Sequence, residues 1–122
     1  MIDRYSRKEL KDIWEEKNKY TIWLNIELAA AESMEKLKII PKGVVKKVKS
    51  KAKINVKRIL EIEKTVKHDV IAFLTSITEK SGKEARYLHK GMTSSDVLDT
   101  CFNLQLKQSG TILLKDIEIL LS

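Results

Sequence analysis

The sequence predicts an all-α fold, and two observations carry that prediction. The chain of 122 residues holds only 1 proline and 4 glycines, so it is poor in the residues that strand-connecting turns need. Its apolar residues recur at helical spacing, with few of the alternations typical of a half-buried strand. We therefore expect a single helical domain over residues 1–122, with an N-terminal domain proper at about 1–93 and a first long helix at 94–122.

The first helix is expected over about residues 7–17. Ser6 and Glu9 have the spacing of a capping box, in which two side chains accept hydrogen bonds from backbone N–H groups at the helix start. The apolar spacing that follows predicts that this helix buries Leu10, Ile13 and Trp14.

Four more helices follow before the last one. The second is expected over about residues 20–38, and Pro41 starts a third that is short and basic. Asn55 is placed to cap a fourth helix, because a short polar side chain accepts from the first free backbone N–H groups. A fifth lies between the His68-Asp69 pair and Gly82, where glycine commonly ends a helix. Residues 84–92 are expected to connect it to the last helix.

The last expected helix, from about Ser94 to Leu121, is apolar on more than one side. One stripe runs from Val97 to Leu104, and a second runs from Leu98 to Leu120. A helix with two apolar faces expects neighbours on both. The pattern stops at Ser122 in mid-course, without a residue that terminates a helix, so we expect a truncated piece of a longer protein.

The net charge of +7 is concentrated in one stretch. Between Glu35 and Lys67 there are twelve Lys or Arg and three Glu. Such a stretch can bind nucleic acid, but no aromatic residue is interleaved with the lysines to stack on bases. The lysines alternate with valines and isoleucines in helical order. We interpret them as a solvated helix face and do not expect nucleic acid as a partner; the alternative is a basic helical module that binds nucleic acid or an acidic partner.

The remaining composition bears on the location of the protein and on its metal and membrane partners. A single cysteine, Cys101, cannot form an internal disulfide, which favours a reducing, cytoplasmic location. No apolar run reaches membrane-spanning length and no signal peptide is visible, so we expect no membrane partner. With two histidines and no paired cysteine or carboxylate spacing, the sequence offers no standard metal site, and we expect no cofactor.

The two histidines, His68 and His89, are the residues best suited to moving a proton near neutral pH. Each lies where a loop enters a helix: His68 precedes Asp69, and His89 precedes Thr93 and Ser94. The N-terminus of a helix offers free N–H donors and a positive dipole end, so it can hold an anion. The same pattern also fits ordinary N-caps beside incidental loop histidines, and the spacing alone does not decide between the two.

Three blocks, taken together, resemble a known family. They are Asp3-Arg4-Tyr5-Ser6, Lys67-His68-Asp69-Val70, and the stretch from His89 through Gly-Met-Thr-Ser-Ser-Asp-Val-Leu-Asp-Thr at residues 91–100. In this order and spacing they resemble the N-terminal domain of the adenylosuccinate lyases, within the fumarase/aspartase superfamily. Argininosuccinate lyases, the related alternative, would carry Ser-Arg-Asn-Asp in the last block.

The resemblance implies a lyase that breaks a C–N bond by β-elimination and releases fumarate. The family's substrates are adenylosuccinate, which gives AMP, and the succinyl-carboxamide ribotide SAICAR, which gives AICAR in purine synthesis. A base removes a proton beside a carboxylate while an acid protonates the leaving nitrogen. Fixed donors can stabilise the charge that builds up on that carboxylate.

Carried over by position, the resemblance implies a role for each candidate residue. His68 and His89 would be the catalytic histidines, without a decision on which is acid or base. Lys67 and Asp69 would line the site beside His68. Relatives often have Arg at the position of Lys67, and lysine keeps the charge but cannot donate the two parallel hydrogen bonds of a guanidinium. The residues that would bind the nucleotide phosphate are Arg4 and Tyr5, and those that would bind a succinyl carboxylate are Thr93 and Ser94.

The resemblance also implies parts that lie beyond residue 122. These are a further catalytic histidine, a mobile serine loop with the signature Gly-Ser-Ser-x-Met-Pro, and the long helices of a homotetramer core. In the family each active site is assembled from more than one subunit. We therefore expect a homo-oligomer acting on a small nucleotide substrate, and no activity from these 122 residues alone.

Overall fold

The computed structural model describes residues 2–122, and within this range it contains helices and no strands. The predicted all-α class is confirmed. Six α-helices and two short 3-10 helices follow one another along the chain. They are η1 (Asp3–Tyr5), α1 (Lys8–Ile13), α2 (Glu16–Lys36), α3 (Val44–Lys51), α4 (Val56–Val66), α5 (Asp69–Ser81), η2 (Gly82–Tyr87) and α6 (Ser94–Leu121).

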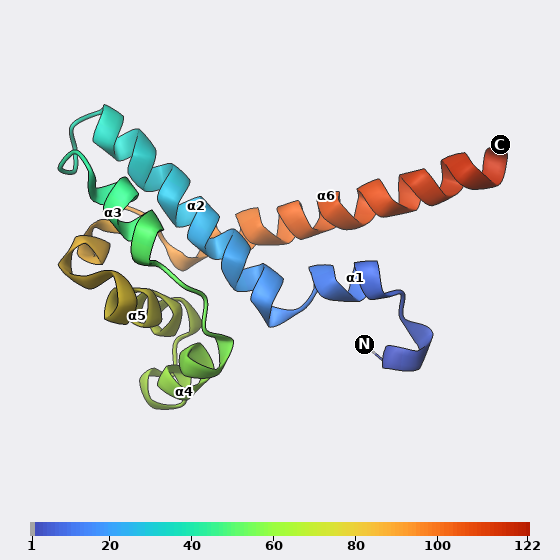
Figure 1. Cartoon of the computed structure of the whole chain (residues 1–122), viewed down its shortest axis with the longest axis horizontal. Helices are drawn as coiled ribbons and strands as arrows, with labels where there is room; N and C mark the ends of the chain where they lie inside the picture. Colours follow the sequence, from blue (N-terminus) through green and yellow to red (C-terminus); the bar gives the residue numbers. More distant parts are fainter. Residues whose placement is uncertain (1) are drawn as a thin grey trace.

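The central element is α2, which lies diagonally across the molecule in Figure 1. Helices α3, α4 and α5 gather on one side of it, and α4 and α5 pack against each other as a pair. Helix α6 packs against α2 with its first half and then extends away, accompanied by α1 (Figure 1). The molecule therefore has a compact end and an extended end.

An aromatic cluster joins α2 to α5 at the compact end. Trp23 lies edge-on to both Tyr20 and Phe73, with ring centroids 5.2 and 5.5 Å apart, respectively. All three side chains are almost completely buried. Aromatic pairs in this geometry contribute beyond their buried area, so the cluster fixes how α2 and α5 meet. Burial also raises the pKa of the Tyr20 phenol, and the negative charge of Glu16 acts in the same direction.

Two helix boundaries follow the local chemistry that the sequence anticipated. The side chain of Asn55 accepts a hydrogen bond from the backbone N–H of Arg58 at 3.1 Å and caps α4, as predicted. Gly82 follows α5 with a φ of +77°, a conformation that glycine adopts without steric cost. Helix α6 has the expected bounds, Ser94–Leu121.

The start of the chain differs from the prediction. The Ser6 hydroxyl donates to the carbonyl of Ile2 at 2.6 Å and does not cap α1, because η1 turns the chain back on itself there. Helix α1 ends at Ile13, where Trp14 and Glu15 leave helical geometry. Trp14 is 39% exposed, so its expected burial is wrong. Its indole N–H donates to Ser109 of α6 at 3.1 Å, and the break before α2 makes this contact possible.

The two halves of α6 have different surroundings. Its buried residues, Val97, Cys101 and Gln105, all lie in the first half, which packs against α2 and, at Gln105, against the end of α1. Farther along, Leu114 and Leu120 are 64% and 84% exposed. Helices α2 and α1 therefore cover part of α6, while apolar side chains farther along it remain exposed. No helix in residues 2–122 combines the length and the apolar character needed to cross a membrane.

Candidate active site

The most unusual pairing in the molecule joins His89 to a buried glutamate. Glu27 lies on α2 and is 0% exposed. One of its carboxylate oxygens accepts the backbone N–H of His89 at 2.7 Å, and the other lies 2.6 Å from Nδ1 of the imidazole. A buried carboxylate is costly unless it is paired and hydrogen-bonded. The two contacts meet that requirement and tie the loop before α6 to the middle of α2.

The backbone at both predicted histidine blocks is left-handed. Lys67 has a φ of +54° and His89 a φ of +60°, and the only other described non-glycine residue with a positive φ is Lys38. Bulky side chains rarely adopt this conformation, and such residues cluster at functional sites when the surroundings hold them. At Lys67 the left-handed turn ends α4 and allows His68 to begin α5 directly.

His68 is the N-cap of α5. Its Nδ1 accepts the backbone N–H of Ile71 at 3.3 Å and lies 3.6 Å from the carboxylate of Asp69. The Asp69 carboxylate accepts the adjacent N–H of Val70 at 2.7 Å. Because Nδ1 accepts, the proton of the neutral ring lies on Nε2. The side chain is 42% exposed, so this N–H donor is open to a ligand.

The start of α6 is arranged around Thr93 and Asp96. Thr93 is the N-cap, and the Asp96 carboxylate accepts its backbone N–H at 2.8 Å and its hydroxyl at 3.4 Å. Within residues 2–122 the hydroxyls of Ser94 and Ser95 donate no hydrogen bond. The donors of Thr93 are therefore occupied, while the serine hydroxyls and the first backbone N–H groups of α6 are available to an anion.

Arg4 and Tyr5 lie apart from the other candidate residues. The Arg4 guanidinium lies over the Tyr5 ring, 4.8 Å from its centroid, and Tyr5 is 75% exposed. Figure 1 places this N-terminal turn beyond α1, on the opposite side of the molecule from α4 and α5. Within one chain the structure thus does not bring Arg4 and Tyr5 to His68.

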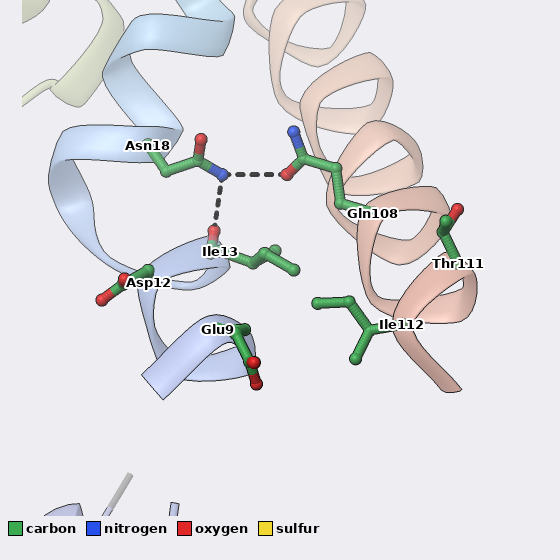
Figure 2. A pocket seen from close by; sticks show the side chains of 7 residues that line it. All are labelled: Glu9, Asp12, Ile13, Asn18, Gln108, Thr111 and Ile112. Carbon is green, nitrogen blue, oxygen red and sulfur yellow. Dashed lines mark hydrogen bonds between the residues drawn. The ribbon is translucent and has the colours of Figure 1, made fainter. Parts of the chain in front are cut away.

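An open cavity of about 430 Å³ lies between α1 and α6 (Figure 2). At its edge the Asn18 amide donates to the carbonyl of Ile13 at 2.8 Å and to the Gln108 side chain at 3.0 Å. The cavity is lined by the carboxylates of Glu9 and Asp12 and by no cation. It contains none of the candidate site residues, and its charge is unfavourable for an anionic substrate.

Glu27 is the site residue that the sequence reasoning missed. It occupies the position four residues after Trp23 and four before Ala31, and both neighbours are buried. One helix face carries residues at this spacing, so an acidic residue there must be buried as well. That signal was available in the sequence, but its partner, His89, lies 62 residues away. Among residues 2–122 no three His, Cys, Asp or Glu side chains gather where they could hold a metal ion.

Comparison with known proteins places this site in context. The chain is 46% identical over 118 residues, 97% of its length, to adenylosuccinate lyase from Bacillus subtilis (strain 168). It spans 27% of the length of that relative. The fold is similar to the crystal structure of fumarate lyase from Mesorhizobium sp. BNC1, with a TM-score of 0.83 and 20% identity, covering 93% of this chain and 29% of that one. No family model matches the chain.

The sequence comparison and the fold agree with each other and with the three motif blocks. Identity of 46% across nearly the whole chain is far above what a shared fold alone requires, since the fumarate lyase has the same fold at 20%. This chain is therefore homologous over nearly its entire length to adenylosuccinate lyase, and it has the fold of a fumarate lyase.

Proposed function

We propose that the chain is the N-terminal part of an adenylosuccinate lyase, a carbon–nitrogen lyase of purine nucleotide synthesis. It would eliminate fumarate from adenylosuccinate, giving AMP, and from SAICAR, giving AICAR. The observation that carries the proposal is the 46% identity to the Bacillus enzyme over 97% of this chain. The match covers 118 of the 122 residues, so the blocks at His68 and Thr93 lie within it, and their residue types suit a polyanionic substrate.

The two histidines are suited to different parts of the elimination. His68 presents an Nε2–H donor from a helix start, because its Nδ1 is occupied by the N–H of Ile71. Such a donor can protonate or hydrogen-bond the nitrogen that leaves when the C–N bond breaks. His89 lies beside the start of α6, where a succinyl carboxylate would be held. We assign both histidines to the site, with Lys67 and Asp69 beside His68.

The start of α6 is the proposed site for the succinyl carboxylate. The expected ligands were Thr93 and Ser94. The hydrogen bonds of Thr93 to Asp96 make Ser94 the better placed donor of the two, and Ser95 adds a second free hydroxyl. A carboxylate bound there would also face the N-terminal dipole of a 28-residue helix.

The position of Arg4 and Tyr5 supports a site completed by another copy of the chain. These residues are expected to bind the nucleotide phosphate, yet they lie far from α5 in this chain (Figure 1). The exposed apolar residues on the far half of α6 also call for further protein around them. We propose a cytoplasmic homotetramer, with residues 1–93 as its N-terminal domain and 94–122 as the start of a long core helix.

Fumarate release from adenylosuccinate, followed by ultraviolet absorbance, tests the proposal. The full-length protein should turn over this substrate, and His68→Ala and His89→Ala should each abolish most activity while circular dichroism still shows the helical fold. The 122-residue chain alone should be inactive. Wild-type turnover in both histidine variants would refute the site assignment, and turnover by the 122 residues would refute the proposal that they are only part of the site.

A further inference from the structure

We propose that Glu27 is a positioning residue for His89. Its buried carboxylate would hold the imidazole with the proton on Nδ1, so that Nε2 offers a lone pair as a hydrogen-bond acceptor. This inference rests on the proposed function in one respect, namely that His89 belongs to the active site. The pairing itself is independent of that function and can be tested separately.

The Glu27 carboxylate holds His89 by two contacts. Both oxygens of one carboxylate contact the same residue, one at the backbone N–H (2.7 Å) and one at the ring Nδ1 (2.6 Å). The Glu27 side chain is 0% exposed, whereas that of His89 is 21% exposed. The carboxylate is thus shielded from water, and the His89 side chain is the part of the pair that a ligand can reach.

The chemistry of the carboxylate determines which ring nitrogen carries the proton. An ionised carboxylate accepts hydrogen bonds and donates none. With one oxygen bound to the backbone N–H, the other must accept from Nδ1–H, and Nε2 of the neutral ring is then the acceptor. A carboxylate behind a histidine fixes tautomer and orientation in the same way in catalytic triads and metal sites. A protonated Glu27 that donates to Nδ1 would give the opposite result, with the proton on Nε2.

A purely structural role explains this arrangement poorly. A buried carboxylate that is paired and hydrogen-bonded often stabilises a fold no more than well-packed apolar residues of the same size would. His89 also takes up a left-handed backbone, at a φ of +60°, to reach the carboxylate. Both features carry a free-energy cost that a leucine at position 27 and a glycine at position 89 would avoid. Both are explained if the orientation of the ring is what the arrangement provides.

The two histidines would then differ in which ring nitrogen carries the proton. His68 accepts a backbone N–H on Nδ1 and presents a donor on Nε2. His89 would donate from Nδ1 and present an acceptor on Nε2. The two rings would therefore present opposite hydrogen-bonding groups, one to receive a proton or hydrogen bond from the substrate and one to give it.

The experiment uses the full-length enzyme labelled with ¹⁵N-histidine, with Glu27→Gln as the variant. A glutamine has one acceptor oxygen where the carboxylate has two, so either the backbone N–H or the ring must face its NH₂ group. NMR should show the Nδ1–H tautomer of His89 in the wild type, and loss of that signal in Glu27→Gln. The turnover kcat should fall at least about tenfold, with a smaller change in KM.

Glu35→Gln is the matched control. Glu35 lies on the same helix and accepts one backbone N–H, that of Val45 at 2.6 Å, without a histidine. Glutamine can keep that single bond, so its tautomer spectrum and kcat should match the wild type. In a His89→Ala background, Glu27→Gln should lower kcat no further, because the residue through which it acts is gone.

Several outcomes overturn the inference. An Nε2–H tautomer of His89 in the wild type would do so alone, even if Glu27→Gln failed to fold. The inference would also be overturned if Glu27→Gln folded and kept the wild-type kcat while the separate variant His89→Ala was inactive. The expected NMR result combined with full activity of His89→Ala would instead refute the proposed function of His89, while the Glu27 pairing would stand.

Discussion

Nδ1 of His68 accepts a hydrogen bond from the backbone N–H of Ile71 at 3.3 Å, so this side chain caps α5 while its other nitrogen is free. A cap and a catalytic donor can be separated by substitution. His68→Asn should keep the cap, since asparagine is among the best N-cap residues, and should still lose most turnover. His68→Ala should lose both, with a destabilisation of about 1 kcal/mol.

Urea denaturation and fumarate release measured on the same two variants check this prediction. Asn55→Ala is a suitable control, because Asn55 caps α4 through Arg58 and has no proposed catalytic role. It should destabilise by a similar amount and leave turnover per folded molecule unchanged. An active His68→Asn enzyme would show that capping is the whole contribution of His68.

The sequence predicted the fold well where local chemistry determines it. The cap at Asn55, the turn at Gly82 and the bounds of α6 follow from residues that act within a few positions of themselves. The first helix failed for the opposite reason. It ends at Ile13, and Trp14 beyond it contacts Ser109, 95 positions away, which no local pattern contains.

The candidate site shows the same division. His68 and Thr93 stand at helix starts and could be found from the order of residues alone. The Glu27–His89 pair needed the packing of the loop before α6 against α2, which only the tertiary structure gives. An acidic residue on a buried helix face predicts that such a pair exists, but it does not predict which residue is the partner.

The Arg58–Glu79 ion pair between α4 and α5 should make stability depend on pH in the acid range. Arg58 donates two hydrogen bonds to the Glu79 carboxylate, at 3.0 and 2.7 Å, and holds the pKa of that carboxyl below its ordinary value of 4.5. A carboxyl with a lowered folded pKa stabilises the protein above its unfolded pKa. That contribution is lost as the pH falls through the folded value.

Thermal unfolding of Glu79→Gln checks this prediction. The variant should melt slightly below the wild type near neutral pH, and the difference should shrink as the pH falls below 4.5. Both partners are well exposed, so the effect should be small and should weaken with added salt. Glu118→Gln is the control, since Glu118 has no ion-pair partner within residues 2–122. A difference that grows on acidification would contradict the assignment.

Ser94 and Thr93 should respond differently to removal of their hydroxyls. Thr93 is the N-cap of α6 and is bound to Asp96, so Thr93→Ala should destabilise the protein by about 1 kcal/mol. The Ser94 hydroxyl has no partner among the described residues, so Ser94→Ala should leave stability within about 0.5 kcal/mol. If it binds the succinyl carboxylate, KM for adenylosuccinate should rise about tenfold, the equivalent of one hydrogen bond to a charged group.

Denaturation and steady-state kinetics on the two variants test this pair of expectations. The informative comparison is between the change in stability and the change in KM for each variant, because each residue acts as the control for the other. A rise in KM confined to Thr93→Ala would show that Thr93, and not Ser94, contributes to substrate binding.

The far half of α6 should drive association between copies of the chain. Leu113 and Ile117 are 51% and 52% exposed and lie four residues apart, on one face of the helix. Apolar side chains gathered this way on an exposed helix face favour burial against another surface. Lysine at both positions should weaken self-association at least tenfold, which corresponds to about 1.4 kcal/mol.

Sedimentation equilibrium of the 122-residue chain measures this self-association. Lys115→Glu is the control, because Lys115 points to the other side of the same helix turn. If the double variant associates as strongly as the wild type, the face at Leu113 and Ile117 is not the contact, and the second apolar neighbour of α6 must be sought on the side of Leu114.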